Sequence, residues 1–423
     1  MRKPDPTRRI AVTGLGVISP VGQDVDTVWE NLVNGRSGLR RITRWDPTDL
    51  DCQAAGEVDF DPTGWMDFKA VRRTARNVPM GVAAAKQALA DSGLEVTDEN
   101  RDDLGVIFGS GIGGPELLID NVEIRDTRGP RAVSPFFIAN MLPDTASGQI
   151  AIETGIRGLN TCIVTACSTG TNCIGEAAEA IKRGDIIAAI AGSVETPIRD
   201  IAYIGFSNMR GMGTPLPGEG LETTSRPYDV TRNGFVLGEG GGALILEDLE
   251  HARARGAKVY AEVVGYGSTA DAWDLIQPIE RGNGVRRAMQ IALDRYGVPA
   301  DEVDMINPHG TSTPVGDLRE AQAIADVFGD HTPDVLVSAT KSMTGHMMGG
   351  CGSFEGLATV LSIHNQVVPA TTNTRVVDPE IAATGLNVLT GASRETRVRY
   401  ALSCNVGLGG HNAAVIFKRY VGA

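Results

Sequence analysis

The chain has 423 residues, of which 42% are hydrophobic and 22% are charged, and its formal net charge is −13 at pH 7. This length is enough for roughly two or three ordinary domains, or for two large halves of one. No stretch reaches the ~18 consecutive apolar residues that a membrane span needs, and an acidic surface repels nucleic acid and acidic membranes. We therefore expect a globular protein with no membrane and no nucleic-acid partner.

The six cysteines are too few for a disulfide framework, and no two of them have the C-x-x-C spacing of zinc or thioredoxin sites. No H-E-x-x-H motif occurs, so no metal site is expected. The basic start of the chain is followed by an apolar run that Gly14 and Gly16 interrupt, without a small-residue cleavage site. We expect a strand there instead of a signal peptide, and a cytoplasmic protein with reduced thiols.

Short apolar runs between glycine-rich turns predict strands that are buried on both faces. They lie at residues 10–13, 104–108, 161–165, 186–191, 259–264, 304–307 and 335–338. Apolar residues with helical spacing follow in each part of the chain, from Ile174 to Ile181 and from Val285 to Ala292. Strands that alternate with helices predict βαβ units, so the expected fold class is α/β.

The best candidate for an internal boundary is the basic turn at residues 251–258, because no Pro- or Ser-rich linker divides the chain. Strands and helices alternate similarly on its two sides, although no direct sequence repeat is visible. We therefore expect two halves of similar architecture, residues 1–256 and 257–423.

Residues 109–114 read G-S-G-I-G-G and have the G-x-G-x-x-G spacing of a dinucleotide-binding loop. Such a site also needs an acidic residue at the end of a second strand about 20 positions later, and no strand is predicted there. A nicotinamide-dependent oxidoreductase is therefore a remote alternative. No G-x-S-x-G motif is present, which argues against a serine hydrolase of that type.

Cys167 is the strongest candidate for a nucleophile. It lies where a predicted strand ends and an amphipathic helix begins. The positive end of a helix dipole stabilises a thiolate, so this position predicts a lowered thiol pKa. The alternative is that Cys167 is a small buried hydrophobic residue, which is the usual place of a cysteine.

Two histidines strengthen the first interpretation. His309 and His346 each follow a predicted strand and lie in glycine-rich loops. Loops at strand ends carry the reactive groups of open α/β sheets, so these imidazoles and the thiol can form one cluster.

Four ordered motifs carry a resemblance to a known family. They are T-A-C-S-T-G at residues 165–170, H-G-T-S-T-P-V-G-D at 309–317, K-S-M-T-G-H-M-M-G at 341–349 and G-L-G-G-H-N at 407–412. Their order and spacing resemble those of type II β-ketoacyl-acyl carrier protein synthases, and the similarity extends over nearly the whole chain. The resemblance implies a thiolase-like fold of two similar halves in α/β/α/β/α layers, with the nucleophile in the first half and both histidines in the second.

The resemblance also implies the reaction, a decarboxylative Claisen condensation that extends an acyl chain with a malonyl unit. Cys167 would carry the acyl group, and the backbone N–H groups of Cys167 and Leu408 would form an oxyanion hole. His309 and His346 would hold the malonyl thioester carbonyl. Two further matching residues, Lys341 and Glu355, would orient the histidines or form a purely structural ion pair.

Substrates of such enzymes are carried on the phosphopantetheine arm of acyl carrier protein, so no metal or free cofactor is implied. Thr311 and Thr313 match positions that bind this arm, and Val406 and Leu408 match the acyl pocket. Four cations are expected to attract the acidic carrier protein, unless they form only a solvated face: Lys69, Arg72, Arg73 and Arg210.

The sequence departs from the family pattern near the acyl pocket. Residues 406–410 read V-G-L-G-G where typical members have F-G-F-G-G, so Leu408 replaces a gating phenylalanine. Residues 274–276 read D-L-I instead of H-M-T, and Cys351 and Ser353 replace small alanines. We expect retained condensation with altered selection of the acyl chain.

The pathway and the partner stay open at this stage. The resemblance fits a fatty acid synthase component or the catalytic ketosynthase of a type II polyketide system, and therefore a homodimer or a heterodimer with a chain-length-factor paralogue. A thiolase would use a second cysteine where this chain has His346, and a non-catalytic chain-length subunit would ordinarily lack Cys167.

Overall fold

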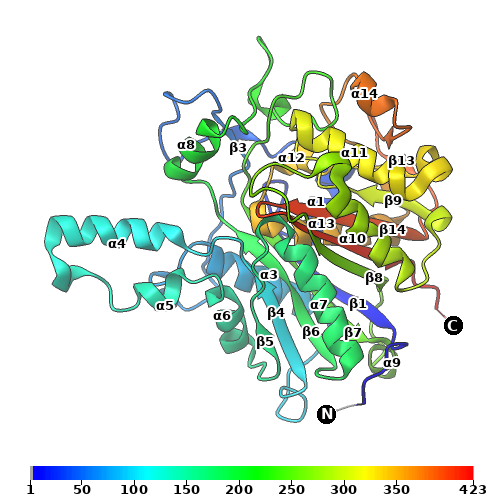
Figure 1. Ribbon diagram of the computed structural model, residues 1–423. Helices are drawn as coiled ribbons and strands as arrows, with labels where there is room; N and C mark the ends of the chain where they lie inside the picture. Colours follow the sequence, from blue (N-terminus) through cyan, green and yellow to red (C-terminus); the bar gives the residue numbers. More distant parts are fainter. Residues whose placement is uncertain (1–2, 423) are drawn as a thin grey trace.

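The computed structural model describes residues 3–422, and its centre is one mixed sheet of eleven strands in the order β12-β10-β9-β14-β15-β8-β1-β7-β6-β4-β5 (Figure 1). The bounds of these strands are β1 Ile10–Ile18, β4 Leu104–Gly109, β5 Asn160–Thr161, β6 Ala188–Glu195, β7 Gly240–Asp248, β8 Ala261–Ala270, β9 Val303–Asn307, β10 Leu336–Val337, β12 Asn387–Val388, β14 Tyr400–Gly407 and β15 His411–Lys418. Two small pairs lie outside this sheet: β2 (Arg40–Arg41) with β3 (Ala54–Ala55), and β11 (Val367–Val368) with β13 (Arg394–Glu395).

The sheet repeats one pattern of pairing on both sides of its centre. On one side, β7 pairs antiparallel with β1 and β6 pairs antiparallel with β7. β4 then pairs parallel with β6, and β5 pairs parallel with β4. On the other side, β15 pairs antiparallel with β8 and β14 pairs antiparallel with β15. β9 then pairs parallel with β14, and β10 pairs parallel with β9. β1 and β8 are joined only through residues 10–12 and 261–263. The duplicated architecture that the alternation pattern suggested is therefore visible in the strand order.

Helices form three layers around the two parts of this sheet. α7 (Thr169–Arg183) and α13 (Cys351–Asn365) lie between them and contact strands of both. α3 (Asn77–Ser92) and α6 (Thr145–Thr154) cover the outer face of the first part, and α10 (Asn283–Asp294) and α11 (Pro314–Phe328) cover the second. This arrangement confirms the predicted α/β/α/β/α layers.

The two central helices, α7 and α13, have different apolar patterns, and each pattern suits a helix that lies between the two parts of the sheet. α13 is buried at every residue from Cys351 to Ile363, which is expected of a helix that is packed on all sides. α7 has the predicted apolar face and ends at Gly184 in the left-handed conformation that glycine adopts readily. The largest apolar cluster contains residues of both helices and of strands from both parts of the sheet.

The remaining helices are peripheral or short. They are α1 (Val25–Val33), α2 (Phe68–Val71), α4 (Pro115–Arg128), α5 (Phe137–Met141), α8 (Asp200–Asn208), α9 (Leu249–Ala254), α12 (Lys341–Thr344) and α14 (Pro379–Ala382). In Figure 1, α4 and α5 extend away from the body of the molecule at the left. Within residues 3–422, no helix combines the length and the apolar character that crossing a bilayer requires.

All seven predicted strands overlap an observed strand, but four strands of the central sheet were not predicted: β7, β12, β14 and β15. β7 begins with three glycines, which weaken a strand signal but are required here, because a Cβ on Gly241 would lie 2.0 Å from the carbonyl oxygen of Ser193. β14 carries buried polar residues, including Asn405, that interrupt its apolar pattern. Of the predicted strand at 161–165, only the first residue lies in β5, because the chain turns toward Cys167.

Candidate active site

The turn that carries Cys167 is fixed by contacts to the other part of the molecule. Cys167 is the middle residue of a 3-10 turn, Ala166–Ser168, that leads directly into α7. Ala166 has φ of 48°, a left-handed conformation that is unusual for alanine. The Ser168 hydroxyl lies 3.1 Å from the Asn405 carbonyl oxygen and 2.9 Å from that of His411, and it donates to this pair of acceptors. The nucleophile candidate is therefore held against β14 and β15.

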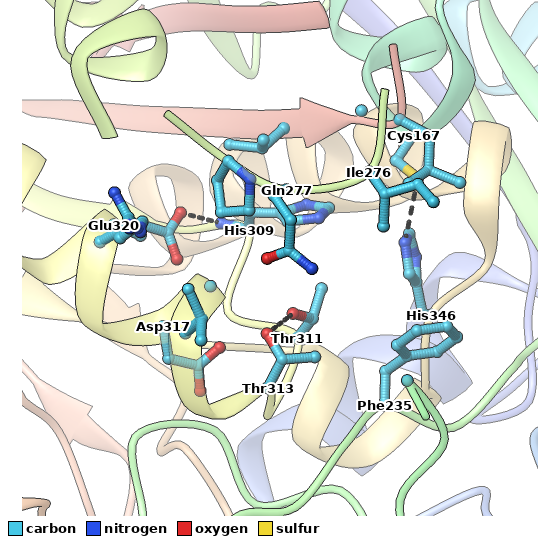
Figure 2. A pocket seen from close by; sticks show the side chains of 18 of the residues that line it. Cys167, Phe235, Ile276, Gln277, His309, Thr311, Thr313, Asp317, Glu320 and His346 are labelled. Carbon is cyan, nitrogen blue, oxygen red and sulfur yellow. Dashed lines mark hydrogen bonds between the residues drawn. The ribbon is translucent and has the colours of Figure 1, made fainter. Parts of the chain in front are cut away.

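His346 faces the sulfur of Cys167. It follows α12 and Gly345, and its Nε2 atom lies 3.1 Å from Cys167 Sγ (Figure 2). The backbone N–H of Met348 donates to His346 Nδ1 over 3.2 Å. Because Nδ1 accepts this bond, the proton of the neutral imidazole is on Nε2 and points toward the sulfur.

His309 lies beside His346 at the end of β9. The two ring centroids are 5.2 Å apart with the ring planes at 86°. The Asn405 side-chain amide donates to His309 Nδ1 over 3.3 Å, which again leaves the proton on Nε2. The backbone N–H groups of His309 and Gly310 donate to the buried carboxylate of Glu320 and fix the loop.

Both imidazoles are neutral at physiological pH. Burial, together with the nearby charge of Lys341, holds the pKa of His309 and that of His346 well below the usual range. A neutral imidazole can donate a hydrogen bond from Nε2 without bringing a net charge into the cavity.

Lys341 and Glu355 form a buried ion pair behind the histidines. The Asn405 amide also donates to Glu355 Oε2 over 2.7 Å, so one side chain links the ion pair to His309. The sequence motifs did not indicate Asn405. Its only signal there is its place shortly before the glycine-rich residues 407–410, which does not distinguish it from other polar residues at strand ends.

The electrostatics of Cys167 differ from the expectation. Helix α7 begins only at Thr169, and burial raises the pKa of the Cys167 thiol to about 11, against the opposing effects of the Leu408 N–H and the charge of Lys341. The predicted lowering of the pKa by a helix terminus is therefore wrong in this structure, because desolvation outweighs the stabilising groups. The resting group is a thiol.

The backbone N–H groups of Leu408 and of Cys167 itself are close enough to the sulfur to favour its ionised form. Gly407 allows this approach, because a Cβ there would lie 2.7 Å from the Thr165 carbonyl oxygen. An oxygen on a carbon bonded to the sulfur would have these two donors within reach, as the predicted oxyanion hole requires.

The side chains of Cys167, His309 and His346 line one cavity of about 390 Å³. Thr311 and Thr313 line it with hydroxyls 3.2 Å apart, and Val406 and Leu408 line it on the side of β14. Figure 2 shows Ile276 and Gln277 over the same cavity. The remaining wall includes several apolar residues: Phe206, Met209, Phe235, Val285 and Met348.

The two loops that depart from the family pattern are bonded to each other. The Gly409 N–H donates to the Leu275 carbonyl oxygen over 2.8 Å. The Asp274 carboxylate accepts from the N–H groups of Ile276 and Gln277 and shapes the turn. Three apolar side chains around residues 274–276 are exposed, namely Trp273, Leu275 and Ile276, and of these Ile276 lines the cavity.

The four cations expected to dock a carrier protein do not all lie at the cavity. Arg210 lines it. Lys69, Arg72 and Arg73 are exposed on or beside α2 and are not among the lining residues; Arg73 lies 4.4 Å from the ring centroid of Phe136 near α5. The α2 cations are therefore on the side of the projecting helices.

The glycine-rich loop at residues 109–114 is occupied by a side chain of the protein. The Glu195 carboxylate accepts from the N–H groups of Gly111, Ile112 and Gly349. Burial raises the pKa of Glu195 to about 7, against the effect of these donors. These amides cannot also bind a pyrophosphate, which removes the basis of the dinucleotide alternative. Within residues 3–422, no group of three or more His, Cys, Asp or Glu side chains is arranged to hold a metal ion.

Comparisons with known proteins agree with the motifs. The model of the β-ketoacyl synthase N-terminal domain matches residues 7–252, and that of the C-terminal domain matches residues 260–375. The 3-oxoacyl-[acyl-carrier-protein] synthase 2 of Staphylococcus aureus is 43% identical over 415 residues, covering 98% of this chain and 99% of that protein. The protein of the same name from Synechocystis sp. is 43% identical over 414 residues, covering 98% of each.

A solved structure is similar over the same extent. The ishigamide ketosynthase/chain length factor superposes with a TM-score of 0.89 at 33% identity, covering 98% of this chain and 100% of that chain. Such a score over nearly the full length confirms the thiolase-like ketosynthase fold.

The raised thiol pKa predicts a particular pH dependence of Cys167 alkylation. Because only the thiolate reacts, the rate with iodoacetamide should rise about tenfold per pH unit from pH 7 and level off only near the thiol pKa of about 11. Mass spectrometry of the peptide that contains Cys167 measures the rate, and a Cys167→Ser variant reports labelling of the other cysteines. A rate that is already constant above neutral pH would contradict the effect of burial.

Proposed function

Because this chain belongs to the β-ketoacyl synthase family, we propose that it joins an acyl group held on Cys167 to a malonyl unit in a decarboxylative Claisen condensation. The observation that carries this proposal is the 3.1 Å contact between Cys167 Sγ and His346 Nε2, with His309 in the same cavity. The chain is accordingly an acyltransferase. The two halves meet at this contact, and we propose residues 1–256 and 257–423 as their extents.

The first half-reaction transfers an acyl group to Cys167. The sulfur attacks the carbonyl carbon of an acyl thioester as its proton is lost, and the departing thiolate of the carrier takes up a proton. The negative oxygen of the tetrahedral intermediate accepts hydrogen bonds from the N–H groups of Cys167 and Leu408. The covalent acyl-enzyme persists until the malonyl substrate binds.

The second half-reaction forms the new carbon–carbon bond. The thioester carbonyl oxygen of the malonyl substrate accepts from the Nε2–H groups of His309 and His346. Loss of carbon dioxide leaves its bonding electron pair as an enolate, whose negative oxygen these two donors stabilise. The enolate carbon attacks the acyl carbonyl on Cys167, and the sulfur departs. Two neutral donors suit this step because the charge appears only during the reaction.

Lys341, Glu355 and Asn405 act on this chemistry through the histidines. Asn405 donates to both Glu355 and His309 Nδ1, so the ion pair and one imidazole share an orienting group. Truncating one partner of a buried pair leaves the other charge uncompensated, which typically costs about 3–5 kcal/mol. We assign these three side chains to positioning.

We propose acyl carrier protein as the partner that delivers both substrates, since the relatives at 43% identity bear that carrier in their names. Thr311 and Thr313, which line the cavity, would bind the phosphopantetheine arm there. Arg210 at the cavity, and Lys69, Arg72 and Arg73 near α2, would steer an acidic carrier. The six free thiols suit a reduced cytosol, which is the proposed location.

The condensation could belong to fatty acid synthesis or to a type II polyketide system, and the sequence identities favour the first. The synthase 2 relatives share 43% identity with this chain, whereas the ishigamide ketosynthase/chain length factor shares 33%. We therefore propose chain extension of the 3-oxoacyl synthase 2 kind, with the polyketide ketosynthase as the second candidate.

We propose that a second copy of the chain covers the outer end of the first sheet part. β5 is the edge strand there and both of its residues are exposed. The projecting helix α4 exposes Leu118, Ile119 and Val122, and unpaired strand edges and apolar patches of this kind mark protein interfaces. A chain-length-factor paralogue is the alternative occupant.

The proposed roles predict different losses for two substitutions. Cys167→Ala should abolish formation of the acyl-enzyme, because no nucleophile remains. His346→Ala should still form the acyl-enzyme but release carbon dioxide from malonyl carrier protein about 10² to 10³ times more slowly, since one enolate donor is lost. Intact-mass spectrometry and carbon dioxide release measure the two steps.

Cys162→Ala is the matched control, because Cys162 lies outside the cavity. It should behave like the unmodified protein in both assays. Acyl transfer that survives in Cys167→Ala, or an unchanged decarboxylation rate in His346→Ala, would disprove the assignment.

Leu408 is proposed to set the selection of the acyl chain. Replacing it with phenylalanine adds a ring beside the nucleophile and should lower kcat/KM for long acyl chains about tenfold more than for acetyl. A ladder of acyl carrier substrates measures this ratio, with Leu408→Met as the volume-conserving control. If the ratio of kcat/KM between long acyl chains and acetyl is unchanged in Leu408→Phe, Leu408 does not determine acyl-chain selection.

The interface proposal predicts a dimer whose formation depends on α4. Light scattering of the purified chain should give twice the mass of one chain, and Leu118→Asp combined with Val122→Asp should give a monomer, because charges in an apolar interface are not compensated. Val376→Asp, at an exposed apolar residue elsewhere, is the control and should stay dimeric. A dimer that survives the α4 substitutions would exclude this surface, and a chain that is stable only with a paralogue would favour the heterodimer.

A further inference from the structure

A second thiol lies on the far side of His346 from Cys167. Cys351 is the first residue of α13, and its Sγ atom lies 3.1 Å from His346 Nδ1. The other ring nitrogen faces Cys167 Sγ at the same distance. Cys351 is fully buried and does not line the substrate cavity. The imidazole is therefore held between two sulfur atoms, only one of which can meet substrate.

The surrounding donors fix the direction of the hydrogen bond between Cys351 and His346. The Met347 N–H donates to Cys351 Sγ over 3.1 Å, and the Met348 N–H donates to His346 Nδ1 over 3.2 Å. Since Nδ1 already accepts a bond, it carries no proton, and the only hydrogen left for the Cys351 contact is that of the thiol. Burial keeps the pKa of the Cys351 thiol well above its usual value, so this hydrogen is present.

We propose that Cys351 is a positioning residue for His346, whose S–H group donates to Nδ1 and thereby holds the imidazole proton on Nε2, aimed at the reaction centre. This inference rests on the proposed function, in which His346 donates from Nε2 to the malonyl carbonyl. The Met348 amide alone binds Nδ1 at the long end of the usual range, so a second donor strengthens the preference for this tautomer.

The size of Cys351 suits its surroundings. The start of α13 is crowded, because Gly350 and Gly352 approach other backbone atoms closely. A sulfhydryl supplies a donor to Nδ1 while it stays small enough for this position.

The proposal predicts how the pKa of His346 changes when the donor is removed. A bond to Nδ1 stabilises the neutral ring, because the protonated ring has no lone pair there. Without the S–H group the pKa of His346 rises, and the acid limb of activity moves to higher pH. The titratable groups that face His346 or its neighbours are Cys167 before α7, His309 after β9, Lys341 on α12, Cys351 and Glu355 on α13, and Glu195 on β6.

Four full-length proteins test this inference: the unmodified chain, Cys351→Ala, Cys351→Ser and Ser353→Ala. The rate of malonyl carrier protein decarboxylation is measured from pH 5 to pH 9. In Cys351→Ala we expect kcat at neutral pH to fall about 3- to 10-fold with KM unchanged, and the acid limb to move up by about half to one pH unit. Cys351→Ser keeps a donor and should restore both.

Ser353→Ala is the matched control in the same helical turn. Ser353 bonds to Ser193 and Gly242 and does not touch His346, so its loss should lower the unfolding temperature and leave the acid limb in place. If Cys351→Ala does not fold, Cys351→Val takes its place, because it fills the volume without a donor. An acid limb and kcat equal to those of the unmodified chain, or a serine variant that behaves like alanine, would overturn the proposal.

A measurement without turnover separates this inference from the proposed function. Nitrogen-15 NMR of histidine-labelled protein reports the protonation of each ring nitrogen, and His346→Gln identifies the signals of His346. We expect an unprotonated, hydrogen-bonded Nδ1 in the unmodified chain and a shift of that signal toward a free imine nitrogen in Cys351→Ala. An unchanged signal would refute the role of Cys351 even if condensation is confirmed, whereas absent decarboxylation with the expected signal would refute only the function.

Discussion

The site depends on one constraint, which is that both imidazoles carry their proton on Nε2 in the cavity that Cys167 lines from the other part of the fold. This requires a donor at the opposite nitrogen of each ring. The Asn405 amide supplies it for His309, and the Met348 N–H, in the turn just before α13, supplies it for His346. Because these donors lie on β14 and in the 3-10 turn that leads into the central helix α13, the layers that bury the core also set the tautomers of both imidazoles.

Burial decides the charge states around this centre. It disfavours the imidazolium form of both histidines and the thiolate form of Cys167, so the reactive groups are neutral before substrate binds. The compensated ion pair of Lys341 and Glu355 lies behind them. Such an arrangement favours a reaction in which negative charge develops on substrate and is met by fixed donors, because those donors need little reorganisation.

The sequence was sufficient for the fold class, because glycine-rich turns between apolar runs indicate buried strands. Its motifs also indicated the loops that bring Cys167, His309 and His346 into one cavity. It did not reveal β7 or β14, whose glycines and polar residues have a reason only in close packing between strands and helices. Asn405 was not recognised either, because its purpose is apparent only from its contacts with Glu355 and His309. The predicted direction of the Cys167 thiol pKa was wrong, because the sequence indicates where a helix begins but does not indicate how far burial removes the thiol from water.

We expect two neutral donors, the Nε2–H groups of His309 and His346, to meet on one substrate oxygen beside Cys167. A crystal structure of the protein acylated on Cys167 and bound to a non-decarboxylating malonyl thioester analogue tests it most directly. The account predicts that the thioester carbonyl oxygen of the analogue lies about 2.7–3.2 Å from Nε2 of both His309 and His346. An oxygen that contacts only one ring, or a ring turned to present Nδ1, would contradict it.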